Sequence, residues 1–135
     1  MSVEENKAVI SRLFTEVFGA GNMDALDDIL ATEVVGHDAT AQEPKRGSES
    51  VRQVAILFRT AFPDARFPLY DLIAEGDKVV ARWGLRGTHR TEFLGIPGTG
   101  RSVEVSGMVI YRLAGGKVVE YWGNCDTLGL MQQLG

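Results

Sequence analysis

The sequence predicts an α+β domain in which three helices cover one face of a curved antiparallel sheet. Apolar residues in the first half recur with the period of an α-helix, whereas from residue 65 onward they alternate with a period of two. The helices precede the strands and do not alternate with them, so a parallel βαβ sheet is not expected. A chain of 135 residues has the size of one domain, and we therefore expect residues 1–135 to fold as a single unit.

Three helical segments are expected in the first half. Ser2 and Glu5 form a capping-box pattern at the start of a helix over residues 3–19. Asn22 is placed to cap a shorter second helix, and Ser48 a third, which the Phe-Pro-Asp run after it ends. The third helix has an apolar face made by Val51, Val54, Ala55, Phe58 and Phe62.

The second half is expected to form a sheet. The alternating segments are residues 66–74, 78–89, 102–113 and 117–126. Short Gly-containing turns join the first of these to the second, and the third to the fourth, as hairpins. The link over residues 90–101 is expected to be a loop that folds over something apolar, and residues 34–47 a short strand that runs into a loop. The final TLGLMQQLG is expected to be a short helical turn or an irregular tail.

Composition excludes several classes of function. No apolar run approaches the roughly 20 residues of a membrane-spanning helix. The net charge is −4 and the cations are scattered, which argues against nucleic acid as a partner. The two histidines and the lone Cys125 form no metal-ligand spacing, and no phosphate-binding glycine loop is present, so we expect neither metal nor cofactor. One unpaired Cys and a charged N-terminus favour the cytoplasm.

A ligand pocket is suggested by the last strand. One of its faces carries Trp122, Asn124 and Asp126, a mixture of apolar bulk and hydrogen-bonding groups that is typical of a pocket. Burial there would raise the pKa of the Asp126 carboxyl and make it a candidate general acid/base. The alternative is that Asp126 only caps a terminal turn that begins at Thr127. Alternation alone does not settle which face of this strand is the inner one.

Other candidate site residues are also open to two interpretations. His37 and His89 could both line one cavity as donors to a substrate carbonyl, or they could be two unrelated histidines. Trp83 and Trp122 could stack on a planar ligand or could belong to the core. The expected substrate-binding set comprises Trp83, Trp122, Asn124, Met108, Tyr111, Phe14 and Phe58.

The segments VVGHDA, AFPDARF, GMVIYRL and EYWGNCDTLG resemble the SnoaL-like polyketide cyclases, also called ester cyclases, and the similarity extends from about Glu4 to Gly135. The resemblance implies a nuclear transport factor 2-like cone with a deep apolar cavity, commonly in a homodimer. It also implies that an Asp near the end of the last strand, here Asp126, acts as acid/base in an intramolecular aldol ring closure without cofactor or metal. The family's best-studied members use a His on the preceding strand, where this chain has none. His37 and His89 are therefore expected to supply polar groups to the cavity instead.

The expected function is therefore a cavity enzyme that closes a ring in an apolar or aromatic small molecule. One alternative is another enzyme on the same cone. An isomerase would need a Tyr and an acid in one site, with Tyr70, Tyr111 and Tyr121 available, and an epoxide hydrolase would need an Arg beside Asp126. A second alternative is a non-catalytic binding or dimerisation module, since fold does not fix function.

Overall fold

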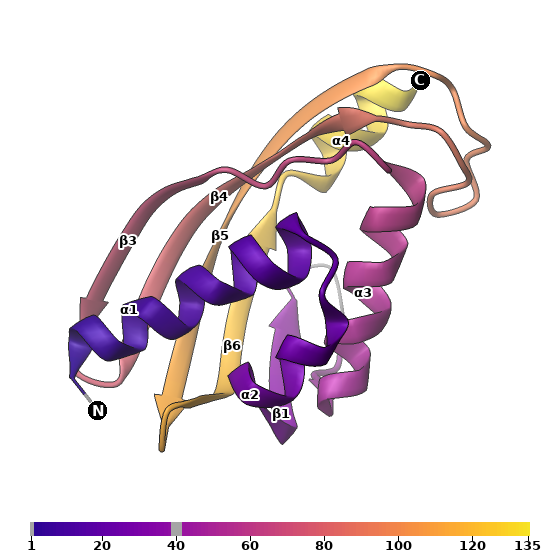
Figure 1. Ribbon diagram of the computed structural model, residues 1–135. Coiled ribbons are helices and arrows are strands. Elements are labelled where there is room, and N and C mark those ends of the chain that lie inside the picture. Colours follow the sequence, from indigo (N-terminus) through magenta and orange to yellow (C-terminus); the bar gives the residue numbers. More distant parts are fainter. Residues whose placement is uncertain (1, 39–41) are drawn as a thin grey trace.

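The computed structural model describes residues 2–38 and 42–135 and confirms the α+β class (Figure 1). The helical segments are α1 (Val3–Arg12), η1 (Leu13–Gly19), η2 (Met23–Ala25), α2 (Leu26–Ile29), α3 (Ser48–Ala61) and α4 (Thr127–Leu134). The strands are β1 (Leu30–Asp38), β2 (Lys45–Arg46), β3 (Leu69–Glu75), β4 (Lys78–Thr88), β5 (Ser102–Ala114) and β6 (Lys117–Cys125). Among the described residues, no helix has the length and apolar character needed to cross a membrane.

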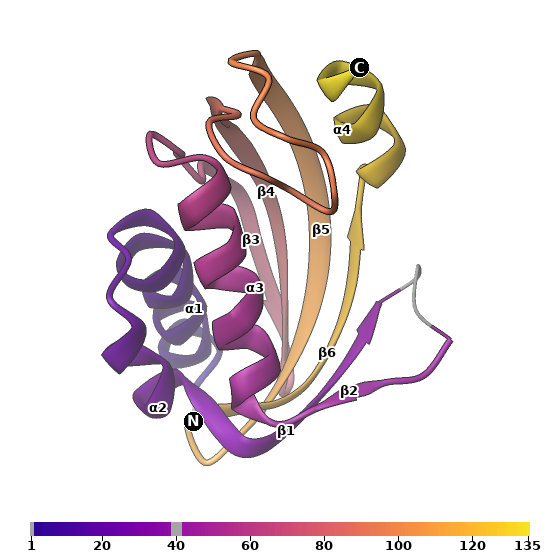
Figure 2. The same ribbon diagram turned by 90° about the vertical axis from the view of Figure 1, so that its right-hand side faces the viewer.

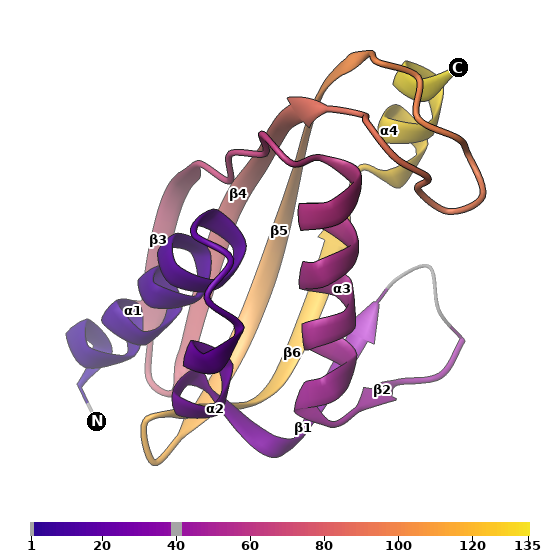
Figure 3. The same cartoon turned by 45° about the vertical axis from the view of Figure 1, so that its right-hand side comes forward.

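The six strands form one curved sheet in the order β2-β1-β6-β5-β4-β3. The sheet bends around α1 and α3, which lie on its concave side, while α4 follows the end of β6 (Figures 2 and 3). All neighbouring pairs are antiparallel except β1 and β6, which run parallel. The prediction of an antiparallel sheet is thus wrong for one pair. Most of the chain separates β1 from β6, so no local turn sets their relative direction.

The first helix begins as its sequence predicts. The Glu5 amide donates to the Ser2 hydroxyl at 3.1 Å, and the Ser2 amide donates to the Glu5 carboxylate at 3.1 Å, which completes the capping box. The helix continues from α1 directly into the π-helical η1 and so spans the predicted 3–19. Gly47, and not Ser48, is the N-cap of α3, where the Ser50 hydroxyl donates to the Gly47 carbonyl at 2.7 Å.

Two short elements differ from the sequence-based expectation. Strand β2 lies in the region expected to be a loop, where it pairs with β1. The terminal segment forms an eight-residue helix, α4, whose first turn is capped by Asp126. Strand β2 forms because the chain after β1 turns back and pairs with it, and α4 forms because Asp126 caps its first turn although the helix contains Gly129.

The core lies between the concave face of the sheet and the helices. On β4 the side chains of Val79, Ala81 and Leu85 are completely buried, and His89 just beyond the strand is buried too. These odd positions face inward as predicted, because successive side chains of a strand point to opposite faces. One apolar cluster packs α1, η1 and α2 against the sheet, and a second gathers around Phe62 at the end of α3. The space between these clusters is the cavity described below.

Close approach between β1 and β6 depends on Gly36. A Cβ atom at this position would overlap the ring of Tyr121, whereas one at Gly123, further along the same inner face, would meet only Val109 at 3.6 Å. We therefore expect Gly36→Ala to displace the Tyr121 ring and to lower the free energy of unfolding by about 1–3 kcal/mol. Gly123→Ala is the matched control and should change stability little. Urea denaturation of the two variants measures the difference, and equal stability would contradict the packing described here.

Candidate functional site

A cavity of about 360 Å³ lies between the concave face of the sheet and the helices. Its volume is in the range of small-molecule sites in proteins. The exposed residues Asp38, Lys45 and Leu94 lie among its lining and mark its mouth. Its apolar wall includes Leu13, Phe14, Phe18, Leu30, Val51, Val54, Leu57, Phe58, Phe67, Trp83, Phe93, Val109 and Leu130.

Aromatic rings dominate this wall. Phe14 and Phe18, one turn apart on η1, stack with their ring centres 5.9 Å apart, and Phe14 lies 6.3 Å from Trp83 on β4. Phe58 on α3 contacts Phe93 with ring centres 5.3 Å apart. The wall thus presents ring faces and edges suited to a flat apolar ligand. Phe14, Phe58 and Trp83 were all expected to bind substrate, and the structure places them around one cavity.

Two tyrosines supply polar groups to the inner face of the sheet. Tyr111 on β5 pairs with Tyr121 on β6, and both line the cavity. Burial raises the pKa of Tyr111, and the nearby Tyr121 raises it further. Burial also raises the pKa of Tyr121, to which the charge of Asp38 adds, against a hydrogen bond with Ser50 that lowers it. Both phenols are therefore protonated at neutral pH and able to donate hydrogen bonds.

Asp38 brings a carboxylate to the mouth of the cavity. It ends β1 opposite Gly123 of β6, and it is the one Asp or Glu in the lining that the described residues form. Its charge acts on Tyr121 and on Cys125, which share the inner face of β6. Burial, then the charge of Asp126, then that of Asp38, raises the pKa of the Cys125 thiol. Asp38 was not among the residues expected in the site, although its place two residues after the lining residue Gly36 puts it on the inner face.

Asp126 does not lie where the sequence predicted. Its side chain is exposed, is absent from the cavity lining, and accepts a hydrogen bond from the Gly129 amide at 2.9 Å as the N-cap of α4. The alternative interpretation, a helix cap, is therefore the one that the structure supports. The expectation that its carboxyl opens into the cavity is wrong. Asp126 is the first residue beyond β6, and α4 turns its side chain toward the helix backbone.

His89 is buried outside the cavity lining, so the expectation that it lines the cavity is also wrong. The Thr99 amide donates to His89 Nδ1 at 3.2 Å, and the Thr99 hydroxyl lies 3.1 Å from the same atom. Nδ1 therefore acts as an acceptor, and the ring proton is on Nε2, which has no hydrogen-bond partner among the described residues. The ring lies 5.6 Å from Phe62. His89 thus ties the 90–101 loop to the end of β4.

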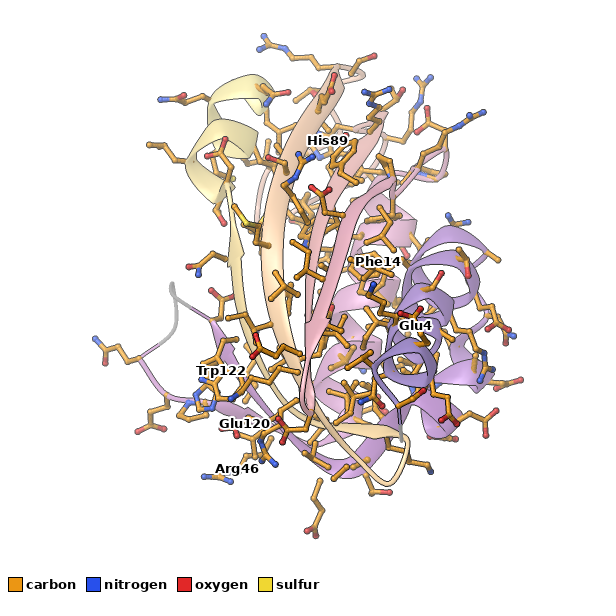
Figure 4. All side chains as sticks on the ribbon, turned by 90° about the vertical axis from the view of Figure 1, so that its left-hand side faces the viewer. Glu4, Phe14, Arg46, His89, Glu120 and Trp122 are labelled. Carbon is orange, nitrogen blue, oxygen red and sulfur yellow. The ribbon has the colours of Figure 1, made fainter. Side chains whose placement is uncertain are left out.

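The imidazole of His37 is engaged on the outer face of the sheet. Its Nε2 lies 2.7 Å from the Glu120 carboxylate, and its ring stacks on Trp122 with centres 5.4 Å apart. Glu120 also accepts hydrogen bonds from Nε and Nη2 of Arg112 at 3.2 and 3.1 Å. The hydrogen bond with His37, followed by that with Arg112, holds the pKa of Glu120 below its usual range. Figure 4 shows Glu120 and Trp122 projecting away from the helices.

Of the three residues on β6 and just beyond it that suggested a pocket, Trp122, Asn124 and Asp126, only Asn124 lies in the cavity lining. Trp122 lies on the outer face, where Met108 of β5 is also exposed, and neither residue lines the cavity. His37 and Asn124 do belong to the lining. The residues that lead into the cavity along β6 are Tyr121, Gly123 and Cys125, which share the other face of the strand. Alternation gave two faces of similar polarity, so only the position of the helices distinguishes them.

Metal ligands do not gather in the part of the chain that the structure describes: no three His, Cys, Asp or Glu side chains come together there. The same portion of the lining contains no Arg. The expected substrate-binding residues Phe14, Phe58, Trp83, Tyr111 and Asn124 lie together around the cavity, and they are joined by Asp38, Tyr121 and Cys125. The arrangement can enclose an apolar molecule and place a carboxylate and neutral phenols beside it.

Comparisons with known proteins agree on one family. The sequence model of the family described as SnoaL-like polyketide cyclase matches residues 8–134. The aklanonic acid methyl ester cyclase DnrD of Streptomyces peucetius is 26% identical over 126 residues, which cover 92% of this chain and 87% of that protein. Among solved structures, TsrD from Streptomyces laurentii is similar with a TM-score of 0.89, 28% identity and coverage of 100% and 98% of the two chains. IdmH from Streptomyces antibioticus is similar with a TM-score of 0.82 and 31% identity, and the match covers 96% of this chain and 97% of IdmH.

The capping role of Asp126 is testable by stability. Asp126→Ala removes the acceptor of the Gly129 amide and should lower the free energy of unfolding by about 1 kcal/mol. Asp126→Asn keeps a side-chain oxygen that can cap and should be nearly neutral. Urea denaturation followed by circular dichroism measures both variants. If both variants destabilise the protein equally, the cap is not what Asp126 contributes.

Proposed function

The chain belongs to the SnoaL-like polyketide cyclase family, and from that premise we propose that it is a cofactor-independent enzyme that closes a ring in an oxygenated aromatic small molecule by intramolecular aldol addition. The observation that carries the proposal is the composition of the cavity: an aromatic wall, two protonated phenols and one carboxylate at the mouth. Its relative DnrD is named as a cyclase of aklanonic acid methyl ester. We take a polyketide of that kind as the substrate class.

Aldol addition needs a base that removes a proton from a carbon beside a carbonyl, and a hydrogen-bond donor that stabilises the negative charge formed on the oxygen. In our proposal the Asp38 carboxylate takes a proton from the carbon beside one carbonyl, and the resulting enolate oxygen accepts a hydrogen bond from Tyr121 or Tyr111. The enolate carbon then bonds to the second carbonyl carbon, whose oxygen receives the proton back from Asp38. All atoms of the product come from the substrate, and the reaction involves no net oxidation or reduction, so it needs no electron acceptor. A positioned acid/base of this kind typically contributes about 100- to 10,000-fold.

The apolar wall serves the same reaction. It holds both ends of a flexible chain in reacting geometry, which can contribute more than the acid/base itself. It also excludes water, so hydrogen bonds from the phenols to a developing negative charge are stronger than in solution. Phe14 and Trp83, which approach each other from η1 and β4, would hold the rings of the substrate.

A proton-shuttling isomerase is the second candidate, because its chemistry also uses a carboxylate and a neutral Tyr in one cavity. Asp38 and Tyr121, whose groups interact, are such a pair. An epoxide hydrolase has less support, since the described lining has no Arg. A non-catalytic binder would use the same aromatic wall without needing Asp38. Turnover by variants of Asp38 therefore separates the enzyme from the binder.

We expect Asp38→Asn to lower kcat by 100-fold or more, because the amide has no basic oxygen with which to take the substrate proton. Aklanonic acid methyl ester is the first assay substrate, and ring closure is followed by liquid chromatography and mass spectrometry. The matched control is Asp126→Asn, which changes the same chemical group outside the cavity and should keep kcat within about threefold.

The two variants also decide between the predictions from sequence and from structure. If Asp126→Asn loses turnover and Asp38→Asn does not, the family-derived role of Asp126 is correct and ours for Asp38 is wrong. If the wild-type protein binds aromatic polyketides and returns them unchanged, the protein is a binder and the enzyme proposal fails. If it shifts a double bond without closing a ring, the isomerase candidate replaces the cyclase.

We also propose that two copies pair through the outer face of the sheet. Ile73, Val80, Ile110 and Trp122 lie side by side in one row across four strands. The side chains of Ile73 and Ile110 are 64% and 39% exposed, and Met108 beside them is 56% exposed. An apolar row on the exposed face of a sheet is favourable only when it is covered, and a second copy offers the same row in a two-fold arrangement.

Ile110→Asp should convert a dimer into a monomer, because it would bury a carboxylate at the centre of the apolar row. The matched control is Ile56→Asp on α3, a residue that is 42% exposed on the helical side. Size-exclusion chromatography with light scattering gives the mass of each variant. If the wild-type protein is still a monomer at about 100 µM, the proposed dimer is wrong.

A further inference from the structure

The loop between β4 and β5 is fixed at both ends. The His89 amide donates to the Arg101 carbonyl at 2.9 Å, and the Gly100 amide donates to the His89 carbonyl at 2.8 Å. The Arg90 amide donates to the Ala61 carbonyl at 2.8 Å, which ties the loop to the end of α3. Figure 2 shows the loop beside the end of α3, on the side of the molecule where α4 lies. Its backbone position is therefore set by the fold.

The inner part of this loop is anchored by Phe93. Phe93 is buried, with ring centres 5.3 Å from Phe58 and 5.5 Å from Phe62. The Phe93 amide donates to the Ile96 carbonyl at 2.9 Å, and the Ile96 amide donates back at 3.0 Å. These two bonds close a tight turn whose central residues are Leu94 and Gly95.

Leu94 has a backbone conformation that its side chain disfavours. Its φ is 49°, and Gly95 follows with a φ of 85°. A two-residue turn with positive φ at both central positions favours Asn, Asp or Gly at the first of them. For Leu this conformation brings Cβ close to the following carbonyl oxygen. Leu94 is the one residue other than Gly with a positive φ among residues 2–38 and 42–135.

The side chain of Leu94 is only partly covered by the rest of the protein. It is 59% exposed, although it belongs to the lining at the mouth of the cavity. A strained backbone and an exposed apolar side chain are both unfavourable in the protein without a ligand. Strain of this kind is retained at ligand-binding sites, where the observed outlier points to function.

We propose that Leu94 is a ligand-contacting residue that packs on the apolar part of a small molecule at the cavity mouth. This proposal rests on the proposed function, because it needs the cavity to bind an apolar ligand. The ligand would be a flat apolar or aromatic molecule that lies against Phe58 and Phe93 and extends outward past Leu94. Leu94 would then set how strongly the enzyme holds the outer part of its substrate.

The test compares stability with binding. Leu94→Asn places a residue favoured in the left-handed region at this turn and should raise the thermal midpoint by about 1–4 °C. The same variant should weaken binding of the neutral fluorescent probe N-phenyl-1-naphthylamine threefold or more, because the apolar contact is lost. Leu94→Met retains an apolar side chain and should bind the probe as the wild type does. Leu128→Asn, on an α4 residue that is 69% exposed and outside the lining, should leave binding unchanged.

The outcomes distinguish a failure of the inference about Leu94 from a failure of the proposed function. If the wild type binds the probe and Leu94→Asn weakens binding less than threefold, or lowers the thermal midpoint, the inference about Leu94 is overturned while the proposed function stands. If Leu128→Asn weakens binding as much as Leu94→Asn does, the effect is not local to the mouth, and the inference is again overturned. If the wild type does not bind the probe, the cavity is not an apolar ligand site, and the proposed function fails together with the inference.

Discussion

The structure depends on one constraint, the strict alternation of side chains between the two faces of a curved sheet. The concave face meets the helices and the cavity, and the convex face meets solvent. A shift of one residue along β6 therefore separates Tyr121 and Cys125, which line the cavity, from Trp122, which does not. The same constraint brings Asp38 to the mouth and places the imidazole of His37 against Glu120 and Trp122. The chemistry available to the cavity follows from this geometry.

Much of the fold could be predicted from the sequence because its signals are local. The capping box of α1, the glycine turns and the alternating β4 each depend on residues close together in the chain. The parallel pairing of β1 with β6 could not be predicted, because it joins distant segments without a turn. The face of β6 was also unpredictable: Trp122 and Tyr121 are similar in polarity, and only the packing of the helices distinguishes inside from outside. Asp38 was missed because a polar run follows it directly.

Polar residues on the two faces of the sheet do different work. Outside, Arg112, Glu120 and His37 link β5, β6 and β1 by hydrogen bonds, so the parallel joint has side-chain support in addition to its backbone bonds. Inside, burial of Tyr111 and partial burial of Tyr121 raise the pKa of both phenols, which are therefore protonated at neutral pH. A carboxylate at the mouth of a cavity with such donors can remove a proton from a bound molecule while its product charge is stabilised. The Glu120 carboxylate on the outside is thus bound by Arg112 and His37, and the Asp38 carboxylate lies at the cavity mouth on the inside.

The backbone hydrogen bonds that join His89 to Gly100 and Arg101 affect how the sequence of this loop can vary during evolution. Because the two ends of the loop are hydrogen-bonded to each other and Phe93 is held in the core, the exposed turn at Leu94 and Gly95 can change in length or sequence without moving β4 or β5. Loop closure entropy grows slowly with length, so insertions at this exposed turn cost little stability. Substrate range can therefore drift through an exchangeable segment, while the scaffold that holds the reactive groups is inherited unchanged.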